Sequence, residues 1–287
     1  MVCESSKKKF EALRYSLIII LIDKLGHAFH SETGASAALA GAMMQTIDGD
    51  DGIFTVEQML SAVRPKTARH APRPVLVSIE NTANFGGGTI WPIKQLISVT
   101  QNAHKLGLKC HMDGARLFNA VIGSGTSAAN YGSTVDSLWI DLSKGLGCPI
   151  GGVLAGDKSF IEAAFRFKHQ FGGAMRQSGI IAAAGIYAIE NNIERISEDH
   201  ENAKLLAKKL TELPEIEIDD SKVETNLVFF DISKTGRTSW DLSKELLRHG
   251  VHIGAISKTI MRAVTHLNIT TKMVHDAANC LATVLKK

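Results

Sequence analysis

Two polar turns follow apolar runs in this sequence, and the first carries a lysine. Lys144 comes after the run Ser137–Leu142, inside the small-residue turn Ser143–Gly147. A lysine held in a partly dry cleft at a strand end loses its proton more readily and can condense with an aldehyde to form an imine. The alternative is a solvated loop lysine, and the motif alone leaves both interpretations open.

The second turn, His111–Arg116, carries a carboxylate and a guanidinium. An aspartate at the carboxyl end of a strand faces the crevice in which open α/β sheets place their ligands, so Asp113 could hold a ring nitrogen protonated there. Arg116 offers a bidentate fork for a carboxylate or a phosphate. Alternatively, Asp113 caps the next helix and pairs with Arg116.

Taken together, the two turns resemble those of the threonine aldolases in the β-eliminating lyase family, pyridoxal 5'-phosphate (PLP) enzymes with the aspartate aminotransferase fold. Further matching segments extend the resemblance through most of the chain: Asp23–His27, Glu32–Ala35, Ile79–Thr82, Gly86–Gly88, Gly172–Gln177 and Arg262–His266. The implied fold class is α/β, a PLP-dependent transferase of fold type I. Its large domain has a mainly parallel sheet, and a smaller α+β domain follows at the C-terminus.

The resemblance also implies a role for each matching residue. Lys144 is expected to carry PLP as a Schiff base, and Asp113 to pair with the pyridine nitrogen and keep the ring cationic. His27 is expected to stack on the ring face and, with Lys144, to take part in catalysis. Arg116 and Arg262 are expected to hold the substrate's α-carboxylate between the two lobes.

Arg176 matches a position near the cofactor phosphate, with a solvated loop arginine as the alternative. The implied reaction is the retro-aldol cleavage of L-threonine or L-allo-threonine to glycine and acetaldehyde through an external aldimine. The partner is therefore a small amino acid substrate. Because relatives build sites between subunits, a homodimer or homotetramer is expected.

Two departures from the family pattern bear on activity. Ala83 stands where the family has a histidine that is expected to reach the substrate's β-hydroxyl, and alanine has neither donor nor acceptor and enlarges the space near Cβ. Met1–Ser16 contain neither the Ser-Asp-Thr segment nor the Gly-Thr-Met-Ala-Asn-like phosphate loop of the family, so part of the large domain is expected to be missing. The alternatives are an inactive remnant or partner subunit, and a PLP lyase acting on another β-hydroxy amino acid.

The elements that position these residues follow from periodicity. Short β-branched runs alternate with longer helical patterns, which predicts βαβ units. Strands are expected at Leu17–Ile22, Val75–Ile79, Lys109–Met112, Ser137–Leu142 and Gly152–Ala155, with helices at Thr55–Val63, Pro92–Leu106 and Lys158–Phe167. A second region is expected to contain a helix at Ile193–Leu210, an alternating segment at Ile216–Ile218, strands at Leu227–Phe230 and Met261–Thr265, and helices at Trp240–Arg248 and Thr271–Leu285. The predicted domains are residues 1–190, which bind PLP, and residues 191–287.

Composition limits the other classes. The 287 residues are 45% hydrophobic and 21% charged, which is typical of a globular protein. The net charge of +3 comes without a basic patch and argues against nucleic acid as a partner. The four scattered cysteines lack metal-ligand spacing and indicate reduced thiols in the cytoplasm. The run Leu17–Ile22 is too short to span a membrane and favours a buried strand over a signal peptide or anchor.

Overall fold

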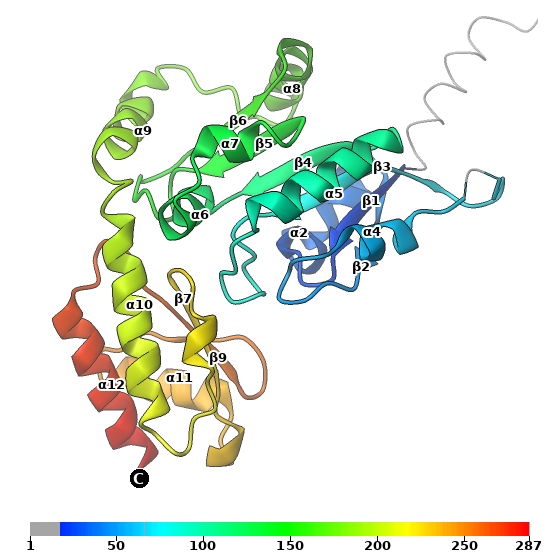
Figure 1. The fold of residues 1–287 in the computed structure, drawn as a ribbon. Helices are drawn as coiled ribbons and strands as arrows, with labels where there is room; N and C mark the ends of the chain where they lie inside the picture. Colours follow the sequence, from blue (N-terminus) through cyan, green and yellow to red (C-terminus); the bar gives the residue numbers. More distant parts are fainter. Residues whose placement is uncertain (1–17, 66, 287) are drawn as a thin grey trace, which may run out of the picture.

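The computed structural model describes residues 18–65 and 67–286, which form two β-sheets with helices around them (Figure 1). The larger sheet has the order β2-β1-β3-β4-β5-β6, and the smaller has the order β7-β9-β8. The strands of the larger sheet are β1 (Ile18–Asp23), β2 (Ala42–Ile47), β3 (Arg73–Glu80), β4 (Lys109–Gly114), β5 (Ser137–Asp141) and β6 (Gly152–Gly156). The expected mainly parallel sheet is thus confirmed.

Strand direction in the larger sheet follows from the length of the connections. Neighbours from β2 to β5 are parallel, and helical crossovers join successive strands. Strand β6 runs antiparallel to β5 because only the turn 142–151 links them. All five expected strands are present, although Leu17 lies outside the described residues. Strand β2 was not predicted, since Ala42-Met43-Met44-Gln45 carries little β-branched signal.

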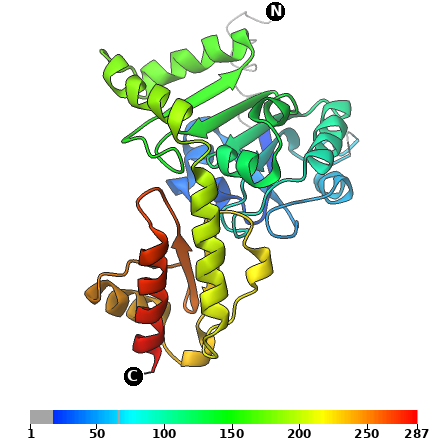
Figure 2. The same cartoon turned by 60° about the vertical axis from the view of Figure 1, so that its left-hand side comes forward.

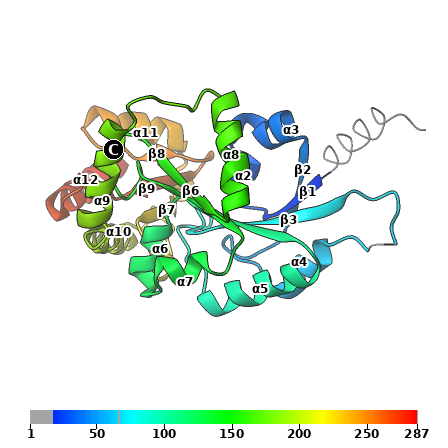
Figure 3. The same cartoon turned by 90° about the horizontal axis from the view of Figure 1, so that it is seen from above.

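Helices lie on both sides of the larger sheet. Figure 3 shows α4, α5 and α7 on one side and α2, α3 and α8 on the other. Their bounds are α2 (His27–His30), α3 (Ala35–Ala40), α4 (Val56–Ala62), α5 (Ile93–Lys105), α6 (Leu117–Ser124), α7 (Ala128–Gly132) and α8 (Lys158–Gln170). A capping box formed by Thr55 and Gln58 starts α4, and the Asp157 carboxylate caps α8.

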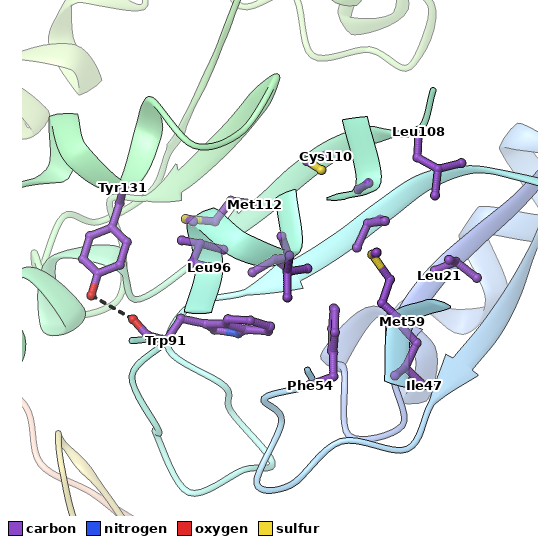
Figure 4. Packing of buried hydrophobic residues seen from close by; sticks show 14 of the residues in the cluster. Leu21, Ile47, Phe54, Met59, Trp91, Leu96, Leu108, Cys110, Met112 and Tyr131 are labelled. Atoms are coloured by element: carbon purple, nitrogen blue, oxygen red, sulfur yellow. Dashed lines mark hydrogen bonds between the residues drawn. The ribbon is translucent and has the colours of Figure 1, made fainter. Parts of the chain in front are cut away.

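The main hydrophobic core lies between the sheet and the helices α4 to α7 (Figure 4). The rings of Phe54 and Trp91 meet edge to face with centroids 4.9 Å apart. The hydroxyl of Tyr131 donates to the Trp91 carbonyl at 3.1 Å. This core fixes the strands whose carboxyl ends carry the predicted site residues.

The second region begins at the long helix α10 (Ile196–Thr211), which runs beside the smaller sheet (Figure 2). Its other elements are β7 (Leu227–Asp231), α11 (Ser239–Arg248), β8 (Gly254–Ala255), β9 (Ile260–Val264) and α12 (Thr271–Leu285). A separate core cluster joins these elements. The alternating segment Ile216–Ile218 forms only a single bridge, between Glu217 and Asp231. Helix α9 (Gly179–Asn191) was not predicted.

Three further observations concern the remaining expectations. No helix within residues 18–65 and 67–286 combines the length and the apolar character needed to cross a membrane. Cys110, Cys148 and Cys280 form no disulfide within the described part of the chain. The expected lack of a phosphate loop concerns Met1–Ser16. These residues, which include Cys3, lie outside the described part of the chain.

Candidate active site

A cavity of about 820 Å³ lies at the carboxyl ends of β3, β4 and β5, and Arg262 of β9 also lines it. Five of the six predicted site residues line it: His27, Asp113, Arg116, Lys144 and Arg262. Parallel strands place their carboxyl ends at one edge of a sheet, so residues far apart in sequence meet there. The other lining residues are Ala28, Ser31, Glu32, Glu80, Asn84, Phe85, Ala115, Trp139, Asp141 and Ile256.

Lys144 stands on the turn that follows β5 and is half-buried. Its Nζ lies 3.3 Å from the Asp141 carboxylate and 5.5 Å from the centroid of the Trp139 ring. The Gly147 N–H donates to the Lys144 carbonyl at 2.9 Å and closes the turn. A hydrogen bond within the turn therefore holds the Lys144 backbone, and the Asp141 carboxylate pairs with its amine. Lys144 is thus not a freely solvated loop residue.

Asp113 is the penultimate residue of β4, and one of its carboxylate oxygens accepts a hydrogen bond. The Ala115 N–H donates to its Oδ1 at 3.1 Å, and its other oxygen has no hydrogen-bond partner among the described residues. Helix α6 has Arg116 at its N-cap position, so Asp113 is not the helix cap. The two side chains also form no ion pair within the described part of the chain. The capping alternative is therefore wrong, and a carboxylate oxygen remains for a cationic ring nitrogen.

A hydrogen-bond network on Glu80 organises the wall of the cavity next to β3. The Glu80 carboxylate accepts the His27 N–H at 2.7 Å and the Asn84 N–H at 2.8 Å. Burial raises the pKa of Glu80 above its usual value, although these two hydrogen bonds oppose the rise. His27 Nε2 lies 3.1 Å from Glu32 Oε1. The His27 ring is nearly parallel to the Phe85 ring, and the two ring centroids are 6.1 Å apart.

Two guanidinium groups reach the cavity, that of Arg116 from the turn after β4 and that of Arg262 from β9 of the smaller sheet. Burial, and then the charge of Arg262, lower the pKa of Arg116, and burial lowers the pKa of Arg262. Arg262 Nη1 donates to Asn84 Oδ1 at 2.8 Å, which ties β9 to the Glu80 network. Two desolvated cations that repel each other provide a ready site for a carboxylate.

Two residues singled out in the sequence lie elsewhere. Ala83 is 3% exposed and does not line the cavity; a Cβ added at Gly52 would lie only 2.4 Å from the Ala83 Cβ. The expectation that Ala83 enlarges the space around the substrate is therefore wrong, because its methyl group packs against the loop at Gly52. Arg176 is exposed between α8 and α9, outside the cavity. Its contact with a cofactor phosphate stays a prediction.

Sequence reasoning did not assign roles to several residues that line the cavity. Glu80 carries the same signal as Asp113, a carboxylate directly after an apolar run, and could have been found by it. Trp139 lies inside the predicted strand Ser137–Leu142, where an aromatic side chain indicates packing and gives no hint of a cavity. Asn84 is identified as part of the site only from its contacts with His27 and Arg262 in the structure.

The residues present fit PLP. The cavity offers an amine at Lys144 for the aldehyde, a partly unpaired carboxylate at Asp113 for a ring nitrogen, and the flat side chain of His27 for stacking. The two arginines add a separate site for a carboxylate. The fold and this set of side chains define a PLP-dependent enzyme of fold type I.

The chain belongs to the beta-eliminating lyase family, whose model matches residues 11–233. It is 35% identical to low-specificity L-threonine aldolase 1 of Arabidopsis thaliana over 88% of this chain and 72% of that one. It is also 35% identical to the low specificity L-threonine aldolase of Escherichia coli K12, over 90% and 74%. A solved Leishmania major threonine aldolase shares the fold, with a TM-score of 0.78 at 19% identity over 98% of this chain and 82% of that one.

Proposed function

We propose that this protein is a PLP-dependent aldolase that cleaves L-threonine and L-allo-threonine to glycine and acetaldehyde. The observation that carries the proposal is one cavity lined by the Lys144 amine, the Asp113 carboxylate and the two arginines. Support comes from relatives about one-third identical whose names are low-specificity L-threonine aldolases. A β-hydroxy-α-amino acid provides the carboxylate for which the arginines are suited.

The substrate is held from both lobes. We propose that residues 1–190 and 191–287 act as two domains, with Arg116 in the first and Arg262 in the second binding the α-carboxylate. Binding one carboxylate between the two guanidinium groups reduces the repulsion between them, which favours this geometry. Lys144 and Asp113 would hold PLP, which would supply an acceptor for the electron pair of the broken Cα–Cβ bond. The Asp113 carboxylate keeps a ring nitrogen protonated, which strengthens that acceptor.

His27 is the proposed proton acceptor for the β-hydroxyl as well as the stacking group. It is the single histidine among the described lining residues of the cavity. The Nε2 of His30 lies 2.6 Å from the Lys24 carbonyl and must therefore donate to it, and His30 does not line the cavity. Glu32, 3.1 Å from His27 Nε2, orients the ring.

The test is to trap the cofactor on the lysine. After incubation with PLP and reduction with borohydride, peptide mapping by mass spectrometry should place the label on Lys144. The Lys144→Ala variant should lose the label and glycine formation from threonine. Lys272→Ala, which changes an exposed lysine on α12, should keep both. Full cleavage activity in Lys144→Ala would reject the assignment.

We further propose that the protein is a cytoplasmic homodimer or homotetramer. The support is a group of large apolar side chains exposed over β6, α8 and α9, which a monomer would leave in water. These side chains are Val153, Leu154, Phe160, Phe165, Phe167, Phe171, Ile180, Ile186, Tyr187 and Ile189. We call this group the β6–α9 surface.

Light scattering after size exclusion should give two or four times the chain mass of 31.0 kDa. Ile186→Asp, on the β6–α9 surface, should shift the species to a smaller one. Leu247→Asp on α11 is the matched control, because the two side chains are 59% and 57% exposed. A wild-type monomer, or equal behaviour of the two variants, would reject the proposed contact.

A further inference from the structure

His266 lies just beyond β9 and outside the cavity, but it contacts the segment that carries the lysine. Its Nε2 is 2.8 Å from the Lys144 carbonyl oxygen. A carbonyl oxygen only accepts, so Nε2 carries the proton and donates it to this hydrogen bond. The bond joins residues 122 positions apart and links the smaller sheet to the catalytic turn of the larger one.

The neighbour of His266 makes an independent contact with the same turn. Gly147 has a φ of +73°, and a Cβ added there would lie 2.1 Å from Leu267 Cδ2. The Leu267 side chain therefore occupies the space next to Gly147, and the positive φ of that residue favours glycine. Two consecutive residues, His266 and Leu267, thus pack on the Lys144–Gly147 turn.

The backbone before His266 is itself firmly held. Thr265 is 2% exposed, and its hydroxyl donates to the Asp199 carbonyl on α10 at 2.6 Å. The Thr265 N–H donates to the Asn226 carbonyl at 3.1 Å, and Asn226 Nδ2 donates back to the Thr265 carbonyl at 3.0 Å. A donor mounted on such a support can fix the position of the carbonyl that accepts from it.

The same short segment carries Arg262. Its guanidinium lines the cavity four residues before His266, and β9 gives the segment a rigid backbone. A shift of β9 that brings Arg262 toward a bound carboxylate would therefore also move the donor that holds Lys144. Asn192 Nδ2 donates to the Leu146 carbonyl at 2.8 Å and anchors the other end of the turn.

We infer that His266 is a positioning residue: it holds the backbone of Lys144 and couples the placement of the lysine to that of Arg262. This inference rests on the proposed function for Lys144. The residue does not touch substrate or cofactor, so its effect should fall on how well the lysine is placed. A misplacement of about 1 Å can lower a rate on the order of a hundredfold.

The experiment compares three variants with wild type. His266→Ala removes the donor, His266→Gln restores an N–H at similar reach, and His275→Ala changes an exposed histidine on α12 as a control. The first readout, taken without PLP, is hydrogen exchange at the Gly147 and Cys148 amides, which donate within the turn to Lys144 and Leu142. The second is the rate at which borohydride fixes PLP on Lys144. The third is kcat and KM for threonine.

For His266→Ala we expect exchange at the turn to rise about tenfold, as for one lost hydrogen bond. The rate of PLP capture and kcat should fall by about tenfold to a hundredfold with KM changed less than about threefold. His266→Gln should recover most of each loss, and His275→Ala should match wild type.

Each other outcome is decisive. Unchanged exchange in His266→Ala overturns the inference, whatever the cofactor does. Faster exchange with normal PLP capture makes His266 merely structural and also overturns it. If wild type captures no PLP on Lys144 while the turn loosens as expected, the proposed function fails and the hold of His266 on the turn stands.

Discussion

The two sides of the larger sheet differ in how well they are covered. On one side, α5 buries Leu96, Val99, Thr100 and Ala103 against the strands. On the other, α8 has the same length of 13 residues and buries none, with Phe165 and Phe167 each 57% exposed. Figure 3 shows the two helices on opposite sides of the larger sheet.

Composition did not cause this difference. The run Ile18–Ile22 in β1 is apolar at every position, a pattern that is typical of strands buried on both faces. Helix α9 is apolar almost all round, as helices in protein interiors are, but buries only Gly185 and Ala188. The well-covered side supports the strand ends that carry the site residues, and the poorly covered side leaves the apolar side chains of the β6–α9 surface exposed.

The largest expected effect tests this contrast directly. Leu96→Ala in α5 should lower the free energy of unfolding by about 3 kcal/mol, since it leaves a cavity in a packed core. Phe165→Ala in α8 should lower it by less than about 1 kcal/mol, because the ring is already half in water. Urea unfolding of both variants at low protein concentration measures the difference. Equal losses would show that α8 is covered in solution.

A medium effect concerns the polar clamp at the start of β5, which ties α5 to β4. Burial alone would raise the pKa of Asp136, but hydrogen bonds from Lys109, the Cys110 N–H and His104 lower it to about 2. A carboxyl group whose pKa is lower in the folded than in the unfolded state stabilises the protein at pH values above the unfolded-state pKa. That stability is lost as the pH falls through the folded-state pKa.

Asp136→Asn should therefore destabilise the protein by about 1 kcal/mol at neutral pH. Relative to wild type, this difference should shrink as the pH falls from about 4 to about 2, since wild type then loses the same charge. Thermal unfolding across that range measures it. A difference that stays constant with pH would mean that the ionised carboxylate contributes nothing.

The smallest effect on stability is expected at Ile180, which is 81% exposed on α9. Ile180→Ser should change the free energy of unfolding by less than about 0.5 kcal/mol. It should nevertheless reduce binding of a dye that reports exposed apolar surface, because it removes part of the β6–α9 surface. Dye fluorescence and urea unfolding on one preparation separate the two effects. Strong destabilisation would mean that Ile180 is buried in solution.

Much of the chemistry of the site is predictable from local sequence patterns. Lys144 and Asp113 each follow an apolar run, and parallel strands bring such turns to one edge, so the expectation that they share a cavity needed only those patterns and the family resemblance. The role expected for Arg262 was predicted from the family motif that the segment Arg262–His266 matches. Glu80 was within reach by the same reasoning and was not assigned a role.

The sequence by itself determined many of the strands and helices and which turns carry reactive groups, because periodicity and capping act between residues close along the chain. Only the tertiary structure decided that Ala83 turns away from the cavity, that Trp139 enters it and that His266 holds Lys144. It also decided which side of the sheet stays uncovered. These outcomes depend on contacts between residues far apart in the chain, and no local pattern specifies them.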